Sequence, residues 1–250
     1  AISNGPKRPP GCLKKFQKWR SPPGRPPFSE FDSGYMNWKK KVFENFRLYA
    51  VTDLPREDPE IFAHVESAYR GGADIVQLRS KALSDEVLFR QGLRFGKIAD
   101  KYRKLFFVND RPHLALAVAA DGVHLGQDDL PIRAVRRLAG KKLWVGKSTH
   151  SLKQALAAVR EGADYIGVGP VFETPTKPGY PAVGLELIQQ VRKRIKIPFV
   201  CIGGIDLHNI HRVLEAGAER VAVVRAVFAA PDVYQASLNF QEAIKQNAKK

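Results

Sequence analysis

Short apolar runs alternate with amphipathic segments along most of this chain, and that alternation limits the folds open to it. Between most of the runs, apolar residues recur at helical spacing, as they do at Ile61, Val65 and Ala68. Repeated strand–helix units predict a parallel sheet covered by helices. Eight strands in about 200 residues predict a closed (β/α)8 TIM barrel, with an open doubly wound sheet as the alternative. The expected strands are residues 48–52, 75–78, 105–108, 122–125, 143–146, 165–168, 198–202 and 221–224.

Three of the expected helices end in the same way, with glycine, alanine and an acidic residue. These phrases are residues 72–74, 162–164 and 217–219. Glycine can adopt the left-handed conformation that ends a helix, and the acid begins the next strand. The repetition indicates similar strand–helix units around one barrel.

The N-terminal residues have a different composition. Residues 1–35 contain seven prolines and no clear apolar periodicity, so they predict an extended or disordered arm. We therefore divide the chain into a basic, Pro-rich arm over residues 1–40 and a catalytic TIM barrel over residues 41–250. The formal charge of +16 attracts polyanions non-specifically, and it is equally compatible with small phosphorylated substrates.

The sequence also argues against several classes of protein. No apolar run approaches the ~18–20 residues of a membrane span, and no apolar stretch follows the basic N-terminus as a secretory signal would. Cys12 and Cys201 fall in the arm and in a core strand, so we expect no disulfide. A reducing cytoplasm is the predicted location.

Cationic and polar residues follow the second predicted strand, where a TIM barrel carries its active site. Gln77, Arg79 and Lys81 alternate along the chain and so face one side of an extended segment. An amide, a guanidinium and an ammonium at that spacing can bind one anion. The alternative is a solvated strand end with scattered charge.

Two aspartates at neighbouring strand ends, Asp110 and Asp129, are the candidate metal ligands. Mg²⁺ prefers oxygen ligands and is commonly held by one or two carboxylates together with substrate phosphates. Asp128 competes with Asp129, because adjacent residues do not easily face the same cavity. A structural role is also open, since Asp129 precedes Leu130-Pro131 and could cap a helix.

The loop after the sixth predicted strand, residues 169–179, combines three prolines with Thr174, Thr176 and Lys177. Two hydroxyls and an ammonium on a stiff loop suit a phosphorylated ligand, whereas the alternative is a rigid turn at the barrel rim. After the seventh strand, Gly203-Gly204 allows backbone N–H groups to approach a phosphate closely. The loops after strands seven and eight are the usual phosphate site of such barrels.

Two histidines lie near these positions. His124 is expected to be a packed or hydrogen-bonding side chain, and His150, close to Ser148, could serve as an acid or base. The sequence has no Ser/His/Asp nucleophile grouping and no Cys/His metal spacing.

Taken together, these strand-end motifs resemble those of the thiamine-phosphate synthase family. The resemblance covers roughly residues 46–228, and the order of the motifs agrees throughout. The matching segments are residues 48–53, 77–81, 109–111, 122–129, 148–150, 169–177 and 202–205.

The resemblance implies a transferase that forms a C–N bond. Hydroxymethylpyrimidine diphosphate and hydroxyethylthiazole phosphate would condense to thiamine phosphate and pyrophosphate, with Mg²⁺ as the cofactor. The family is thought to pass through a pyrimidine-stabilised carbocation that the thiazole nitrogen captures, so no protein nucleophile is needed.

The resemblance also implies roles for residues of this chain. It places Asp110 and Asp129 on the magnesium ion and Ser148 beside the pyrimidine. The implied catalytic residues are Arg79, Lys81, Ser148 and Lys177. The implied contacts of the pyrimidine diphosphate are Gln77, Arg79, Lys81, Asn109 and Lys177, and those of the thiazole phosphate are Thr174, Thr176 and the backbones of Gly204, Val224 and Arg225.

The sequence departs from the family pattern at two positions, and the basic arm has no counterpart in that pattern. Ser80 stands where an acid is common, and Arg225 stands where a serine is common. If the family uses only the backbone N–H at the second position, Arg225 is harmless and its guanidinium can add a contact. If a small hydroxyl is required there, affinity for the thiazole phosphate falls.

Two other functions stay open. One is the related thiazole tautomerase, a metal-independent isomerase in which His150 would be the acid/base residue and the diphosphate-binding cations would be dispensable. The other is a polyanion- or RNA-binding barrel that acts through its basic arm. The complete cationic and acidic set at the strand ends favours the synthase.

We expect small phosphorylated substrates as partners, no membrane, and nucleic acid only through the arm; the oligomeric state is left open.

Overall fold

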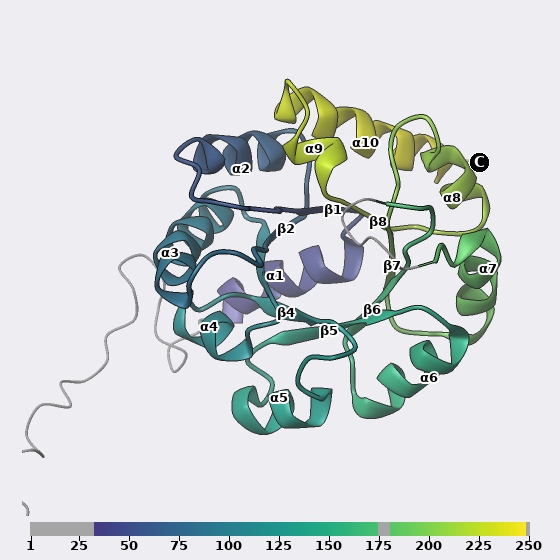
Figure 1. Cartoon of the computed structure of the whole chain (residues 1–250), viewed down its shortest axis with the longest axis horizontal. Helices are drawn as coiled ribbons and strands as arrows, with labels where there is room; N and C mark the ends of the chain where they lie inside the picture. Colours follow the sequence, from purple (N-terminus) through teal and green to yellow (C-terminus); the bar gives the residue numbers. More distant parts are fainter. Residues whose placement is uncertain (1–32, 175–180, 249–250) are drawn as a thin grey trace, which may run out of the picture.

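The computed structural model describes residues 33–174 and 181–248, with side chains described from residue 37 onward. In these residues eight parallel strands close into a barrel, in which each strand pairs with the next and β8 pairs with β1 (Figure 1). The predicted (β/α)8 TIM barrel is confirmed, and the open sheet is wrong. The strands are β1 (Leu48–Val51), β2 (Ile75–Leu78), β3 (Leu105–Asn109), β4 (Gly122–Leu125), β5 (Trp144–Thr149), β6 (Tyr165–Val168), β7 (Phe199–Ile202) and β8 (Val221–Val223).

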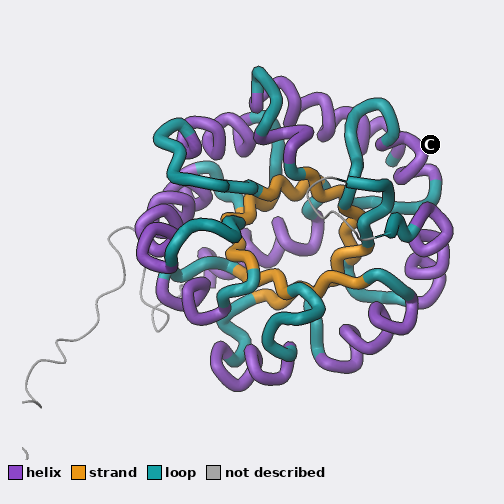
Figure 2. Tube along the Cα trace, viewed as in Figure 1, coloured by secondary structure: helices purple, strands orange, loops and turns teal. Residues whose placement is uncertain are grey.

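Helices surround the barrel, as the outer ring in Figure 2 shows. Ser84 and Ser151 begin two of them, because each side chain accepts a hydrogen bond from a backbone N–H of the first turn. Within the described residues, no helix has the length and apolar content needed to cross a membrane. The helices are α1 (Ser33–Asn45), α2 (Ile61–Arg70), α3 (Asp85–Lys101), α4 (Pro112–Ala117), α5 (Ile132–Ala139), α6 (Leu152–Glu161), α7 (Gly184–Arg194), α8 (Ile210–Glu215), α9 (Arg225–Phe228) and α10 (Val233–Asn247).

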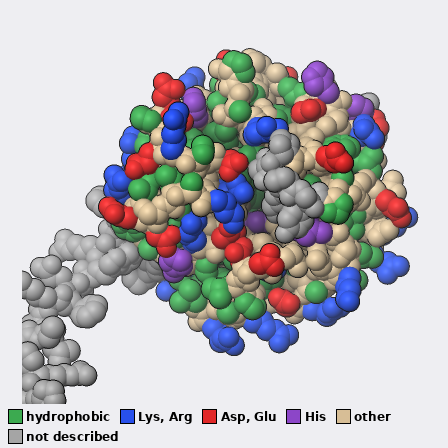
Figure 3. Space-filling view, viewed as in Figure 1, with side chains coloured by type: hydrophobic (Ala, Val, Ile, Leu, Met, Phe, Trp, Pro, Cys, Tyr) green, Lys and Arg blue, Asp and Glu red, His purple; other side chains and the backbone are tan. Residues whose placement is uncertain are grey.

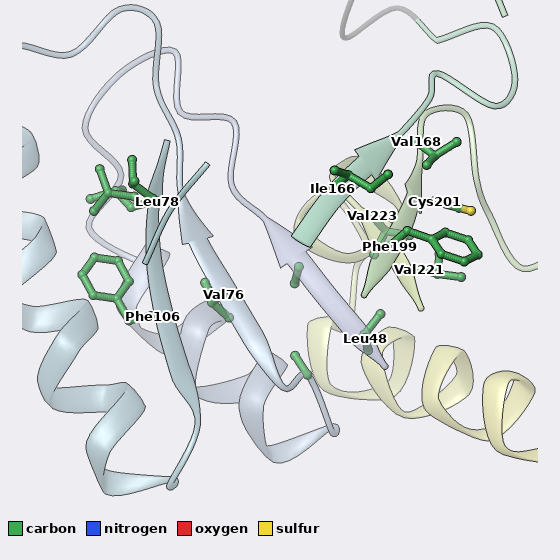
Figure 4. Close-up of a cluster of buried hydrophobic side chains, with 14 of the residues drawn as sticks. Leu48, Val76, Leu78, Phe106, Ile166, Val168, Phe199, Cys201, Val221 and Val223 are labelled. Atoms are coloured by element: carbon green, nitrogen blue, oxygen red, sulfur yellow. The ribbon is translucent and has the colours of Figure 1, made fainter. Parts of the chain in front are cut away.

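Alternation along each strand divides the core into two layers. Leu48 belongs to the outer layer beneath the helices, whereas its neighbour Tyr49 belongs to the layer inside the barrel. Figure 4 shows part of the outer layer, with Leu48 on β1 and Cys201 on β7. Cys201 is a buried free thiol, and Cys12 lies outside the described residues. Because both faces are buried, the strands read as continuous apolar runs in the sequence.

The glycine–alanine–acid phrases end helices as predicted. Gly162 is the C-cap of α6, with a φ of 92° in the left-handed region. Asp164, two residues later, accepts the backbone N–H of Val145 at 2.6 Å. Asp74 does the same for the N–H of Arg47 at 2.9 Å. Each of these acids therefore ties the start of one strand to the start of its neighbour.

Helix α1 is a feature that the sequence did not predict, and it lies behind the barrel in Figure 1, at the end where the strands begin. Phe43 stacks on Trp144 with ring centroids 4.5 Å apart and meets Tyr165 edge-on at 6.1 Å. The Lys39 Nζ donates to the Asp121 Oδ1 at 2.5 Å, and both side chains are only 5% exposed. The predicted division at residue 40 falls within this helix and stays a prediction. Most of the predicted arm, residues 1–32, lies outside the described residues.

Strand β5 continues to Thr149, so its predicted end at Gly146 is wrong. The ladder with β6 runs unbroken through Ser148. The polar side chains of Lys147 and Ser148 interrupt the apolar pattern, although the backbone pairing continues. Ser148 is therefore held by a strand, which fixes its position at the barrel mouth.

Candidate active site

A cavity of about 480 Å³ opens at the C-terminal ends of the strands. Figure 3 looks onto this face and shows basic, acidic and histidine side chains gathered around its centre. Thr176 and Lys177 lie outside the described residues. The predicted site residues that line the cavity are Gln77, Arg79, Asn109, Ser148, Thr174, Gly204, Val224 and Arg225.

Arg79 is fixed in the cavity wall through its backbone and its side chain. Its backbone N–H donates to Oγ1 of Thr52 at 2.9 Å, and its guanidinium pairs with the carboxylate of Asp53. The Arg79 side chain is 12% exposed and that of Asp53 is 41% exposed, so the acid holds the cation from the solvent side. Sequence reasoning assigned no role to Asp53. A guanidinium held in this way suits an anionic ligand, because little ordering is left for binding.

Lys81, Asp110 and Asp129 meet on the rim, after the ends of β2, β3 and β4. Lys81 pairs with Asp110, and the carboxyl groups of Asp110 and Asp129 lie close enough for each to shift the pKa of the other. Burial and the neighbouring Asp110 raise the pKa of Asp129. Burial also raises the pKa of Asp110, but hydrogen bonds with Asp129 and Lys81 outweigh it and hold that pKa below its usual value. Two carboxylates placed so closely repel each other when both are ionised, and a cation bound between them would remove that repulsion.

Of the two adjacent acids, it is Asp129 that lies beside Asp110. Asp128 is exposed, whereas Asp129 is half-buried and its Oδ2 accepts the Gly126 N–H at 2.6 Å. The same loop is fixed by Lys147, whose Nζ donates to the Gly126 carbonyl at 2.6 Å. The interpretation of Asp129 as a helix cap is wrong, because α5 begins after Pro131 with no capping side chain.

The Asp110 and Asp129 side chains fit a metal ion whose remaining ligands come from water and from the phosphate oxygens of a bound substrate. Within residues 33–174 and 181–248, no three His, Cys, Asp or Glu side chains come together as a metal site. Asp110 and Asp129 offer two carboxylates. Mg²⁺ commonly takes one or two carboxylates from the protein and the rest of its ligands from water and phosphate oxygens.

Ser148 and His124 form a hydrogen-bonded pair in the cavity wall. The His124 Nε2 lies 2.9 Å from the Ser148 Oγ, and its Nδ1 lies 2.9 Å from the phenol oxygen of Tyr165. His124 is thus the hydrogen-bonding histidine that the sequence predicts, although Tyr165 was not identified as its partner. His150 also lines the cavity, with its Nδ1 in contact with the Gly169 carbonyl.

Gly203 and Gly204 lie close against the loop that follows β6. Their φ values are 100° and 64°, in the region that favours glycine. A Cβ on Gly203 would lie 2.4 Å from Pro170, and one on Gly204 would lie 2.5 Å from the Glu173 carbonyl oxygen. Packing alone therefore requires both glycines. Arg225, the first residue of α9, follows the neighbouring strand β8 and is exposed in the cavity wall.

Comparison with known proteins supports the resemblance noted in the sequence. The family model described as thiamine monophosphate synthase matches residues 48–227. A thiamine-phosphate synthase of Shouchella clausii is 44% identical over 203 residues, which cover 80% of this chain and 97% of that protein. One of Gloeobacter violaceus is 46% identical over 200 residues, which cover 80% of this chain and 58% of that protein. The chain thus spans little more than half the length of some of the curated relatives that it matches.

A solved structure agrees with these matches. The thiamine phosphate pyrophosphorylase from Pyrococcus furiosus is 35% identical, with a TM-score of 0.76, and the alignment covers 82% of this chain and 98% of that one. The family model covers more than half of this chain, and the Shouchella clausii relative is matched almost end to end. The chain therefore belongs to the thiamine monophosphate synthase family.

Proposed function

We propose that this protein is a Mg²⁺-dependent thiamine-phosphate synthase, which joins hydroxymethylpyrimidine diphosphate to hydroxyethylthiazole phosphate. The observation that carries the proposal is the pair of carboxylates, Asp110 and Asp129, beside Lys81 on the rim of a cavity that Arg79 lines. A diphosphate leaving group gains negative charge as its bond breaks. Cations placed where that charge grows stabilise the transition state.

In this reaction the C–O bond between the pyrimidine methylene carbon and the diphosphate breaks, and its electron pair leaves with pyrophosphate. The lone pair of the thiazole nitrogen then forms the new C–N bond. A Mg²⁺ ion held by Asp110 and Asp129 would supply electrostatic stabilisation of the leaving oxygens. The side chains that bind these oxygens are Arg79, Lys81, Asn109 and Lys177, of which the last lies outside the described residues.

The rest of the cavity holds the two rings against each other. Gln77 and Ser148 bind the pyrimidine from the side of β2 and β5. Holding both reactants in one cavity removes much of the entropic cost of a two-substrate step, so binding and orientation supply the catalysis without a protein nucleophile. The groups that bind the thiazole phosphate are Thr174, Thr176 and the backbones of Gly204, Val224 and Arg225.

A coupling assay tests the proposal. The purified protein is incubated with both substrates, with Mg²⁺ or with EDTA, and thiamine phosphate is measured as fluorescent thiochrome. We expect product with Mg²⁺, none with EDTA, and none when the thiazole phosphate is left out. A folded protein that yields no product under any of these conditions would overturn the proposal. Thiazole isomerisation would then be measured in the wild type and in the His150→Ala variant.

A further inference from the structure

A chain of hydrogen bonds runs through the interior of the barrel and ends at the cavity. It begins at Gln77, whose Nε2 donates to the phenol oxygen of Tyr49 at 2.7 Å. The phenol oxygens of Tyr49 and Tyr165 are 3.1 Å apart. His124 follows, with its Nδ1 2.9 Å from Tyr165 and its Nε2 2.9 Å from the Ser148 Oγ. Gln77, His124 and Ser148 line the cavity, whereas the two tyrosines do not.

The two tyrosines are buried and neutral. Tyr49 is 2% exposed and Tyr165 is 0% exposed. Burial raises the pKa of both phenols above the usual tyrosine value. Each hydroxyl therefore keeps one proton at neutral pH, and a buried hydroxyl proton without an acceptor is costly.

With the Gln77 amide donating to Tyr49, only one arrangement gives every phenol proton of the chain an acceptor. Because Gln77 donates to Tyr49, the proton of Tyr49 is directed to Tyr165, and the proton of Tyr165 is directed to the His124 Nδ1. An Nδ1 that accepts belongs to a neutral imidazole with its proton on Nε2. That Nε2–H donates to Ser148, whose own hydroxyl proton is then directed away from His124. The Gln77 Oε1 is likewise left as an acceptor.

We propose that Tyr165 is a positioning residue, which holds His124 in its Nε2–H tautomer and so presents the Ser148 hydroxyl to the cavity as a hydrogen-bond donor; Tyr49 connects Tyr165 to Gln77. The cavity wall then offers the Ser148 hydroxyl as a donor and the Gln77 Oε1 as an acceptor. This pair is complementary to a heteroaromatic edge that carries a ring nitrogen beside an amino group. The ligand half of this inference rests on the proposed function, since an aminopyrimidine has such an edge. The tautomer half rests on the hydrogen bonds alone.

Two glycines leave the space that this chain of hydrogen bonds occupies. A Cβ on Gly146 of β5 would lie 2.1 Å from the Cζ of Tyr165, the carbon that carries the hydroxyl. A Cβ on Gly167 of β6 would lie 3.2 Å from the Cε1 of His124. Strands β5 and β6 therefore lack a side chain at the two positions where the phenol of Tyr165 and the imidazole of His124 lie.

The first test is a direct measurement of the His124 tautomer in the wild-type protein. Two-bond ¹⁵N–¹H correlation spectra at about pH 8, above the usual histidine pKa, distinguish a protonated Nε2 from a protonated Nδ1. We expect the proton on Nε2. A proton on Nδ1 would mean that the chain runs in the opposite direction and would overturn the proposal. The measurement needs no substrate, so it stands apart from the synthase assay.

The second test removes one hydroxyl at a time. Tyr165→Phe deletes the donor to the His124 Nδ1, so we expect the imidazole to become a mixture of tautomers. Tyr49→Phe leaves that donor in place, so the Nε2–H tautomer should persist. Tyr69→Phe is the matched control, because it also removes a buried phenol, one that donates to the Leu105 carbonyl outside the cavity. An unchanged tautomer in a folded Tyr165→Phe variant would refute the positioning role.

Kinetics extend the same comparison to the ligand. Tyr165→Phe should raise the KM of the pyrimidine diphosphate about three- to tenfold, the effect of one weakened hydrogen bond. The KM of the thiazole phosphate should stay unchanged, as should both constants in Tyr69→Phe. Equal effects on both substrates in Tyr165→Phe would contradict recognition of the pyrimidine edge. If the wild-type protein makes no thiamine phosphate while its tautomer is as expected, only the proposed function fails.

Discussion

The carboxyl groups of Asp110 and Asp129 lie close enough for each to shift the pKa of the other, although they follow two different strands. Asp110 adopts a φ of 61°, in a region that few residues other than glycine occupy. Asp129 is held by the N–H of Gly126. Two carboxylates this close repel each other when both are ionised, and the cation of the proposed function would relieve that repulsion.

Replacing one of these acids should abolish most of the activity and leave the fold intact. Asp110→Asn removes a proposed metal ligand without changing the size of the side chain, and we expect kcat to fall about 100-fold or more, since a bound metal supplies several kcal/mol of transition-state stabilisation. Steady-state kinetics over a range of Mg²⁺ concentrations would measure the loss. Asp128→Asn is the matched control, because this neighbouring acid is exposed. Near-normal turnover in Asp110→Asn would refute the metal assignment.

The stability of the metal-free protein should depend on pH through Asp129. Its pKa is raised in the folded state by burial and by Asp110, so the folded chain holds this proton more tightly than the unfolded chain. Stability therefore falls as the pH rises from the usual aspartate pKa of 3.8 through the raised value. The lowered pKa of Asp110 acts in the opposite sense, because its contribution is lost as the pH falls through the folded value.

Asp129→Asn should remove the loss of stability that accompanies ionisation of Asp129. The melting temperature of the variant relative to the wild type, both in EDTA, should rise as the pH is increased from about 4 to 7. Added Mg²⁺ should raise the melting temperature of the wild type more than that of the variant. A difference in melting temperature that does not change with pH would show that the two carboxyl groups do not interact in solution.

Arg79 should not be replaceable by lysine. Its guanidinium pairs with Asp53, and a lysine cannot keep that contact while also presenting two donors to a phosphate. We expect Arg79→Lys to lower kcat/KM for the pyrimidine diphosphate about tenfold or more, as the loss of a charge-assisted hydrogen bond would. Arg90→Lys is the control, since Arg90 forms an exposed pair with Glu57 at 3.4 Å. Equal kinetics of the two variants would contradict a role for the guanidinium.

The Arg225 side chain should add affinity for the thiazole phosphate. It is exposed in the cavity wall, where family members commonly carry serine. Arg225→Ser should raise the KM of the thiazole phosphate about three- to tenfold at low salt with little change in kcat, and the difference should shrink as salt screens the charge. Arg137→Ser, which removes an exposed arginine of α5, controls for net charge. A lower KM in Arg225→Ser would show instead that a small hydroxyl is required.

The strands and the barrel could be predicted because each buried strand carries its own apolar pattern and turn residues. Relationships between distant residues could not be predicted in the same way. Tyr49 and Tyr165 are 116 residues apart, and only the closure of the barrel brings their hydroxyls together. The choice between Asp128 and Asp129 depends on the path of an irregular loop, to which no periodicity applies.

Helix α1 could not be predicted either, because it is held by packing contacts with distant residues. Three consecutive lysines, residues 39–41, interrupt its apolar residues, and the first of them is buried, so periodicity does not reveal the helix. Phe43 is buried because Trp144 lies beneath it, and that partner comes from another part of the chain. The site residues were easier to predict from the sequence, because a TIM barrel places the C-terminal ends of all its strands on one face.

The buried ion pair between Lys39 and Asp121 allows a test of whether α1 belongs to the barrel. The two side chains are 2.5 Å apart and each is 5% exposed, and Asp121 also accepts the Phe106 N–H at 2.8 Å. Lys39→Met would leave the carboxylate buried without this cation, which typically costs about 3–5 kcal/mol. Urea unfolding should show that loss. Lys40→Met should change stability by less than about 1 kcal/mol, because Lys40 is exposed and pairs with Glu44 at 3.8 Å. Equal stabilities of the two variants would show that α1 is not anchored and would support a domain boundary near residue 40.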